Sequence, residues 1–365
     1  MLYFYKHVDH DMDKMQKFID FIFKNVWCKA PDGLEFSVEL FESLPELKSI
    51  VSKAGYGIKA PESGKNFFNS VKDIYNLFAI LGTDDIARIT QWYTYNNDIE
   101  AACANTQINI VRYKELCRAY PELGSALKKF FTNLWDHDAL NIKAFKDIIH
   151  TKGEHFTKFR EVNKNYICPF CGIERMKNMY DTAREAYDHY LPKSLYPFNS
   201  INFLNLVPAC HACNSDYKLT NDPLYKGDNR RKAFFPFAIN NPQIKVSITF
   251  SHSDLSKITP QDVTIAYGPN AEQEEITTWR EVYKIDERYK AVCCGSEGKE
   301  WLQQILDEWE EHRGDPQDDG RTPDKFMERL EKDYQRNPFA ETRFLKKAYL
   351  EACREKGLFS TPQPA

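Results

Sequence analysis

Two pairs of cysteines have the spacing of a metal site. Cys168 and Cys171 form one CxxC pair, and Cys210 and Cys213 form a second, with 38 residues between the two pairs. Four thiolates from two such pairs can close around one tetrahedral Zn²⁺, which contributes folding free energy to a segment too short to build its own core. A redox dithiol would need only one CxxC pair. The sequence therefore predicts a structural zinc site.

The residues between and just after these pairs have the types that phosphodiester hydrolysis needs. Asp188 and His189 are adjacent between the pairs, Asn205 precedes the second pair, and Asn214 follows it directly. A histidine can deprotonate water near neutral pH. A hard divalent cation held by oxygen ligands can neutralise charge on the phosphate. Without the flanking cysteines we would interpret Asp188 and His189 as a surface polar pair; with them, a catalytic role is favoured.

Together these residues resemble the HNH endonucleases in their zinc-binding, four-cysteine form. The resemblance covers the segment from Cys168 to Lys218 and implies a β-hairpin followed by a helix, the ββα-metal module. It implies that His189 is the general base and that Asn205 fixes the loop that presents it. The catalytic Mg²⁺ or Mn²⁺ would be held by Asp188 and Asn214, the latter in place of the final histidine of the family name.

The same resemblance suggests two lysines as contacts to the substrate phosphate. Family members often carry a lysine three residues after the last metal ligand. Here Tyr217 has that position and Lys218 follows it, so the sequence leaves the helix register open. Lys193, which closely follows His189, is the second candidate. For both lysines the alternative is an ordinary solvated side chain.

A longer string is similar to a particular group of these enzymes. The phrases DHYLPKS and NLVPACHACN, with the later stretch Val263–Tyr289, are similar to the HNH subunit of Septu-type anti-phage systems, which is paired with an ATPase. The similarity implies a DNA-cleaving effector of prokaryotic defence. An ATPase partner would supply the capture or control of DNA.

A second class of function stays open at this point. A zinc-stabilised adaptor that binds nucleic acid or protein without cutting would use the same four cysteines. It predicts no dependence on Mg²⁺ and no role for His189. The residues also do not distinguish DNA from RNA.

Composition points to a folded chain without a membrane span. The 365 residues are 42% hydrophobic and carry a formal net charge of −4, so any grip on nucleic acid must be local or supplied by a partner. No apolar run approaches the roughly 20 residues that span a bilayer. Polar residues close behind Met1 disfavour a signal peptide, and ten cysteines without a secreted framework indicate the cytoplasm. Two basic stretches flank the zinc segment and are candidates to line a nucleic-acid path. They are Lys143, Lys146, Lys152, Lys158, Arg160 and Lys164 before it, and Lys226, Arg230, Arg231 and Lys232 after it.

Apolar spacing predicts a mainly helical α+β protein. Stripes at three- and four-residue intervals run through Met15, Phe18, Ile19, Ile22 and Val26, through Val71, Ile74, Phe78 and Leu81, and through Leu302, Ile305, Leu306 and Trp309. The β-prone strings KVSITF (245–250) and DVTIAY (262–267) predict a small hairpin. We expect a helical N-terminal domain (1–160), the HNH nuclease module (161–235), and a C-terminal region of short β segments and helices (236–365).

Overall fold

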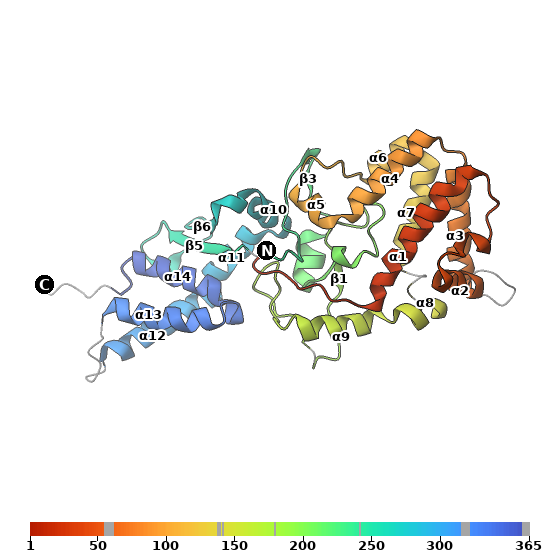
Figure 1. The fold of residues 1–365 in the computed structure, drawn as a ribbon. Helices are drawn as coiled ribbons and strands as arrows, with labels where there is room; N and C mark the ends of the chain where they lie inside the picture. Colours follow the sequence, from red (N-terminus) through yellow and green to blue (C-terminus); the bar gives the residue numbers. More distant parts are fainter. Residues whose placement is uncertain are drawn as a thin grey trace. The chain divides into compact units, whose positions relative to one another are not determined.

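The computed structural model of the chain is a mainly helical α+β protein, as the sequence predicts (Figure 1). It describes residues 1–54, 62–136, 140, 142–178, 180–240, 242–314 and 322–359. Contacts divide the chain into two compact units. Unit 1 comprises Met1–Tyr3, Ile167–Met176 and Asn240–Ala365, and unit 2 comprises Phe4–Tyr166 and Lys177–Ile239. The three consecutive domains expected above stay a prediction about functional modules.

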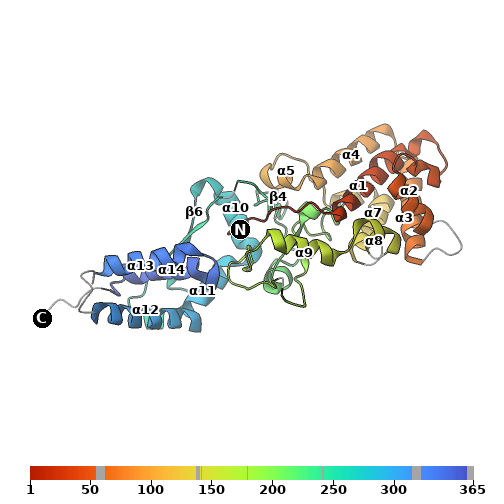
Figure 2. The same cartoon turned by 60° about the horizontal axis from the view of Figure 1, so that its bottom comes forward.

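Unit 2 begins with a series of helices. Their bounds are η1 (Asp11–Asp13), α1 (Lys14–Phe21), η2 (Ile22–Val26), η3 (Trp27–Asp32), η4 (Val38–Phe41), α2 (Pro45–Ala54), α3 (Glu62–Ala79), α4 (Thr83–Asn97), α5 (Ile99–Ala104), α6 (Tyr113–Ala119), α7 (Pro121–Asp136), α8 (Lys143–Ile149) and α9 (Lys152–Val162). The helix α3 packs against η3 and α7, and α6 packs against α7. Figure 2 shows α1, α3 and α7 gathered in one bundle, as does the first view.

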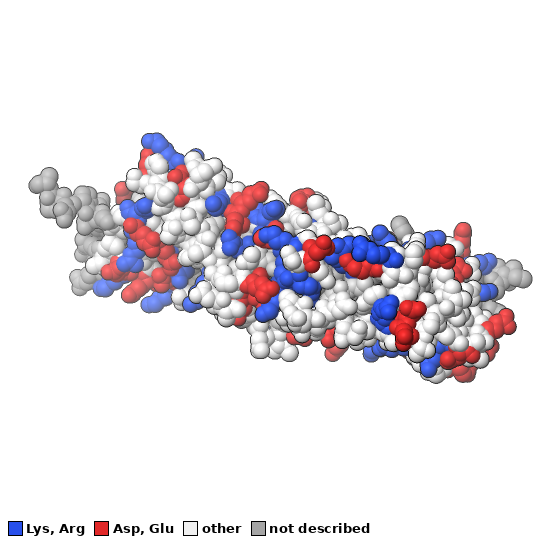
Figure 3. Space-filling model, turned by 90° about the horizontal axis from the view of Figure 1, so that it is seen from above, with Lys and Arg blue, Asp and Glu red and all other residues white. Residues whose placement is uncertain are grey.

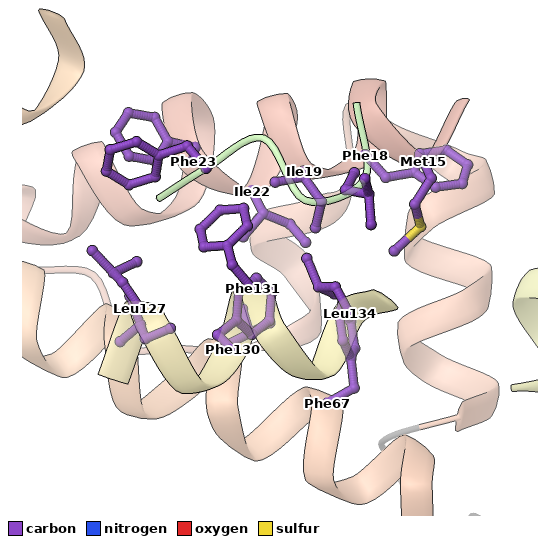
Figure 4. Packing of buried hydrophobic residues seen from close by; sticks show 14 of the residues in the cluster. Met15, Phe18, Ile19, Ile22, Phe23, Phe67, Leu127, Phe130, Phe131 and Leu134 are labelled. Carbon is purple, nitrogen blue, oxygen red and sulfur yellow. The ribbon is translucent and has the colours of Figure 1, made fainter. Parts of the chain in front are cut away.

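The core of this bundle is formed by the first apolar stripe predicted from the sequence. Met15, Phe18, Ile19 and Ile22 are buried, and the stripe continues from α1 into the π-helical turn η2. Figure 4 shows these side chains facing those of α7 and α3. The facing residues are Phe67, Leu127, Phe130, Phe131 and Leu134. We call this cluster the helical core.

A short strand–strand–helix unit follows within unit 2. Strand β1 (Tyr187–His189) pairs antiparallel with β2 (Leu206–Pro208), so that His189 lies opposite Leu206. The one-turn helix η6 (Phe203–Asn205) leads into β2, and η7 (Ala212–Lys218) follows it. We call residues 187–218 the hairpin segment. The β-hairpin followed by a helix that the sequence implied is therefore present, and a further small hairpin, β3 (Tyr225–Lys226) with β4 (Asn229–Arg230), comes after it.

Unit 1 contains the second predicted hairpin. Strands β5 (Lys245–Phe250) and β6 (Val263–Gly268) pair antiparallel along their full length, and α14 packs on β5, with the Phe250 and Tyr349 rings 5.3 Å apart. The remaining elements are η8 (Leu255–Lys257), η9 (Asn270–Glu272), α10 (Gln273–Tyr283), α11 (Ile285–Cys294), α12 (Ser296–Gly314), α13 (Pro323–Arg336), η10 (Ala340–Thr342) and α14 (Arg343–Glu355). The third apolar stripe lies on α12, where Ile305 and Trp309 are buried.

The surface carries charges of both signs. Figure 3 shows lysine and arginine interspersed with aspartate and glutamate on the face seen from above, which agrees with the small net charge. Any attraction for a polyanion must therefore come from a local cluster. Among the residues that the structure describes, none of the helices combines the length and the apolar character needed to cross a bilayer.

Candidate functional site

The four cysteines of the two CxxC pairs come together. All four residues are buried, and the Sγ atoms of Cys168, Cys171, Cys210 and Cys213 lie within 4.8 Å of one another. A tetrahedral Zn²⁺ with Zn–S bonds of about 2.3 Å needs sulfur atoms about 3.8 Å apart. The cluster fits that arrangement after a contraction of less than about 1 Å. The chain therefore has a site that can hold a metal ion such as zinc.

The first cysteine pair lies in a tight turn. The amide of Gly172 donates to the carbonyl of Cys168 at 2.7 Å, and the amide of Ile173 donates to Sγ of Cys171 at 3.5 Å. Gly172 has φ +69°, and a Cβ there would lie 2.2 Å from Cδ1 of Leu2. Only glycine fits this position, because it tolerates the left-handed backbone and the close neighbour.

Aromatic residues of unit 1 hold the same turn from outside. The indole nitrogen of Trp279 donates to the Phe170 carbonyl at 2.6 Å, and the Tyr289 hydroxyl donates to the Cys171 carbonyl at 2.9 Å. The Phe170 ring stacks on Tyr283 with centroids 4.8 Å apart. Buried carbonyls need hydrogen-bond donors, and Trp279 of α10 and Tyr289 of α11 supply them here, so these two helices help to set the shape of the first pair.

The second pair starts the helix of the hairpin segment. The amide of Cys213 donates to Sγ of Cys210 at 3.4 Å, and the amide of Asn214 donates to the Cys210 carbonyl at 3.0 Å. The helix η7 then continues with π-type winding, in which the amide of Leu219 donates to the Asn214 carbonyl at 3.3 Å. Metal binding at Cys210 and Cys213 would therefore also orient Asn214.

This π-helical winding accounts for the shifted lysine. A helix closed by bonds five residues apart has more residues per turn than an α-helix. The residue that returns to the face of Asn214 therefore comes one position later. Lys218 occupies that place, while Tyr217 remains half-buried. The phosphate contact expected of Lys218 stays a prediction.

His189 is held in one orientation by its Nε2 atom. This atom lies 2.8 Å from the carbonyl oxygen of Ser200. A carbonyl only accepts, so Nε2 carries the proton and Nδ1 is left as the proton acceptor of the ring. Burial lowers the pKa of His189 to about 3, which keeps the imidazole neutral near pH 7. The Trp135 ring meets it edge-on with centroids 5.0 Å apart, and the residue retains 8% exposure.

The loop that carries Ser200 is tied to the helical bundle. The Ser200 hydroxyl donates to the Phe131 carbonyl of α7 at 2.6 Å. The side-chain amide of Asn199 donates to the Asn96 carbonyl of α4 at 3.1 Å. The orientation of His189 therefore depends on helices far away in the sequence.

Asn205 bridges the chain just beyond His189. Its Oδ1 accepts from the amide of Leu191 at 2.7 Å, and its Nδ2 donates to the carbonyl of the same residue at 3.0 Å. Asn205 is fully buried. The side chain thus holds both backbone groups of Leu191, two residues after His189, which is the placement that its expected role in fixing the loop requires.

Asp188 forms a buried ion pair with Lys218. The Lys218 ammonium donates to Oδ1 of Asp188 at 2.9 Å and to the His189 carbonyl at 2.8 Å. The exposed side-chain fractions are 0% for Lys218 and 4% for Asp188. The other carboxylate oxygen, Oδ2, is buried and has no hydrogen-bond partner among the described residues. Burial raises the pKa of Asp188, although Lys218 opposes that shift.

The remaining predicted residues are more exposed. Asn214 is half-buried at the start of η7. Lys193 forms an ion pair with Asp136 at the end of α7 and is 25% exposed. The structure therefore brings Lys218 into contact with the Asp188 carboxylate and the His189 backbone carbonyl, ties Asn205 to Leu191, and leaves Lys193 engaged with a carboxylate.

Several residues near the site were not identified from the sequence. Ser200 and Trp135 contact the His189 ring, and His155 lies beneath β1, where its Nδ1 and the Tyr187 hydroxyl are hydrogen-bonded. Burial lowers the pKa of His155 to about 4. No local pattern could have identified these residues, because each contact joins segments at least ten residues apart. A metal-ligand spacing signal existed only for the cysteines.

A second group of possible metal ligands lies at the start of unit 2. One ligand atom each of His7, Asp9 and Asp13 lies within 4.8 Å of the others. His7 and Asp9 are exposed, and Nε2 of His7 is 3.4 Å from Asp13. Exposed acidic groups of this kind are common without an ion, so we assign no role to this group.

Comparison with known proteins gives one short match. The chain is 37% identical over 71 residues to Protein ea31 of Escherichia phage lambda, an alignment that covers 19% of this chain and 20% of that protein. The chain thus spans about one fifth of the length of the curated relative it matches. No protein-family model and no solved structure matches the chain.

Proposed function

We propose that the chain is a metal-dependent HNH endonuclease that hydrolyses phosphodiester bonds in DNA. The observation that carries the proposal is the pairing of His189 with Asp188 on one short strand. The imidazole is neutral and has Nδ1 as its acceptor, because Nε2 is bonded to Ser200. Among the residues that the structure describes, one buried oxygen of the adjacent carboxylate has no hydrogen-bond partner. A general base beside an unsatisfied carboxylate oxygen suits hydrolysis assisted by a cation.

Asp188 and Asn214 carry oxygen atoms of the kind that a divalent cation prefers. The Oδ2 atom of Asp188 and the side-chain oxygen of Asn214 would hold Mg²⁺ or Mn²⁺. When bound, the cation supplies charge neutralisation for the phosphate and the leaving oxygen. His189 takes a proton from water through Nδ1, and Asn205 and Ser200 keep the ring in place. Zn²⁺ at the four cysteines would have the structural role.

The biological setting is a finer part of the same proposal. The DHYLPKS and NLVPACHACN strings support an effector of a prokaryotic anti-phage system that acts with an ATPase. The net charge of −4 and the mixed surface are compatible with a partner that supplies DNA capture. Ten cysteines without a secreted disulfide pattern support a cytoplasmic location.

One observation favours a second candidate function. Oδ1 of Asp188 is occupied by the ammonium of Lys218, and a buried lysine in such a place could replace a cation altogether. The chain would then be a zinc-stabilised adaptor that binds nucleic acid or protein without cutting. The adaptor predicts no dependence of any activity on Mg²⁺.

Plasmid cleavage decides between the two candidates. The purified chain, with any co-purifying partner, is incubated with supercoiled DNA in Mg²⁺, in Mn²⁺ and in EDTA. We expect cleavage in the presence of metal, none in EDTA, and a loss of at least a hundredfold in His189→Ala. A hundredfold loss is the lower end of the contribution of a general base, which is about 10²–10⁴-fold.

The matched control is His252→Ala, which removes an exposed histidine of unit 1 and should leave cleavage unchanged. Zinc content and melting temperature should match the wild type in both variants. Full cleavage by a folded His189→Ala variant would overturn the assignment. If neither the wild type nor the His189→Ala variant cleaves DNA, and both still bind it, the adaptor is favoured.

A further inference from the structure

A group of basic side chains surrounds Trp135, next to His189. Nζ of Lys152, the first residue of α9, lies 3.8 Å from the Trp135 ring centroid and donates to the Trp135 carbonyl at 2.9 Å. The Trp135 ring in turn contacts the His189 ring. Lys193 is paired with Asp136, the residue after Trp135. Lys152 thus contacts the Trp135 ring, and Lys193 contacts the residue next to Trp135 in the sequence.

A third cation belongs to the same group. Burial lowers the pKa of Lys152 to about 8, with contributions from the positive charges of Arg184 and Lys193 and partial compensation from Asp136. Arg184 is exposed and lies three residues before β1. The group formed by these four side chains therefore contains three cations and one carboxylate. Near it, the Asp188 carboxylate is already paired with Lys218.

One carboxylate offsets only part of the repulsion among three cations in such a group. Like charges at close range repel one another, and a half-buried lysine loses solvation in addition. A phosphodiester placed over Trp135 would offset both costs. It would also lie beside the His189 ring, which is where a scissile phosphate must arrive if His189 activates water.

We infer that Lys152, Arg184 and Lys193 form a phosphate-binding surface that delivers the backbone of a nucleic-acid substrate to His189. This inference rests on the proposed nuclease function and names the residues that capture its substrate. The contacts are to phosphate, so the surface binds without sequence preference. The Asp136 carboxylate pairs with Lys193 in the free chain, and a phosphate would have to displace that carboxylate. Asp136 therefore weakens phosphate binding.

The test is binding of a fluorescein-labelled DNA duplex in EDTA, measured by anisotropy over a series of salt concentrations. The variant combines Lys152→Gln, Arg184→Gln and Lys193→Gln. We expect its affinity to fall at least tenfold and the slope of log K against log salt to flatten by about 2 to 3, because each lost phosphate contact removes about 0.9. Asp136→Asn should bind more tightly than the wild type.

The matched control replaces three exposed lysines of the helical bundle, Lys24, Lys72 and Lys129, by glutamine. It removes the same charge and should bind nearly as the wild type does. Because Lys152 is partly buried, a double variant of Arg184 and Lys193 repeats the test with Lys152 intact. Affinity and salt slope equal to those of the control, in either variant, would overturn the inference.

A small substrate separates failure of this inference from failure of the nuclease proposal. Hydrolysis of bis(p-nitrophenyl) phosphate with Mn²⁺ should require His189, and it reports on the proposed base without a DNA-binding step. DNA binding that survives the charge variants, together with hydrolysis that depends on His189, overturns the surface alone. Hydrolysis that does not depend on His189 overturns the nuclease proposal, while the binding series still tests the surface.

Discussion

The helical core and the hairpin segment are both buried, but with different kinds of side chain. The helical core packs aromatic and aliphatic groups between α1, α3 and α7. The hairpin segment holds seven of the fourteen buried polar or charged residues of the described chain: Asp188, His189, Asn199, Ser200, Asn202, Asn205 and Lys218. Apolar burial stabilises without directional bonds, whereas each buried polar group needs a partner. The helical core therefore stabilises the fold, whereas the buried polar groups of the hairpin segment stabilise it less and fix the orientations of their side chains.

The two regions also differ in how specific their contacts are. An apolar stripe on α1 needs only some apolar surface opposite it, so substitutions of similar volume are tolerated. The His189 ring is held by its hydrogen bond to the Ser200 carbonyl. Ser200 is itself held by the bond from its hydroxyl to the Phe131 carbonyl. Loss of one of these hydrogen bonds would displace the His189 ring without unfolding the chain. The following experiments test this contrast, from the largest expected effect to the smallest.

Loss of one cysteine should have the largest effect on the hairpin segment. In Cys213→Ser we expect loss of bound zinc and a lower melting temperature. Binding of zinc contributes about 10–16 kcal/mol in small zinc-finger peptides, so even partial loss outweighs the other changes. Metal analysis and a thermal melt measure it. The control is Cys294→Ser, a half-buried cysteine outside the cluster; zinc retained in Cys213→Ser would contradict a four-thiolate site.

Removal of the buried ammonium should come next. Lys218→Met keeps the volume but leaves the Asp188 carboxylate buried without its partner, which costs about 3–5 kcal/mol. Urea unfolding in EDTA measures the loss. The double variant with Asp188→Asn should recover part of it, because no buried charge remains. Equal destabilisation by the single and double variants would show that the ion pair is not the reason.

Acid should weaken the support beneath β1. The pKa of His155 is about 4 in the folded chain and 6.5 ordinarily, so the native state binds fewer protons than the unfolded state between these values. Its contribution is fully present above pH 6.5 and is lost as the pH falls toward 4, by about 3 kcal/mol. Urea unfolding at several pH values should show a shallower pH dependence for His155→Phe. The exposed His252→Ala should leave the dependence as in the wild type.

The end of η7 offers the smallest effect. Leu219 has φ +48° and a 59% exposed side chain, so it has backbone strain and little packing. We expect Leu219→Gly to stabilise the chain by up to about 1 kcal/mol. Thr220→Gly, one residue later, should instead destabilise slightly, because glycine only adds freedom to the unfolded chain. Thermal melts compare the two.

Local patterns were sufficient for much of the fold. The stripe from Met15 to Ile22 predicted the first helix, and two β-prone strings predicted the β5–β6 hairpin, because period and chain length report which face is buried. The CxxC spacing predicted the four-cysteine cluster, since a metal imposes its own geometry on ligands. The catalytic roles of His189, Asp188 and Asn214 stay predictions.

The amino-acid sequence by itself determined the mainly helical fold, the β5–β6 hairpin and the cysteine cluster, because each follows from the spacing of residue types along the chain. Only the tertiary structure decided that Lys218 reaches Asp188, that Nε2 of His189 is bonded to Ser200, and that Trp135 lies against the proposed base. Those contacts join elements separated by 11 to 54 residues. Their geometry depends on how α7, α9 and the π-helical η7 pack, which no local periodicity encodes.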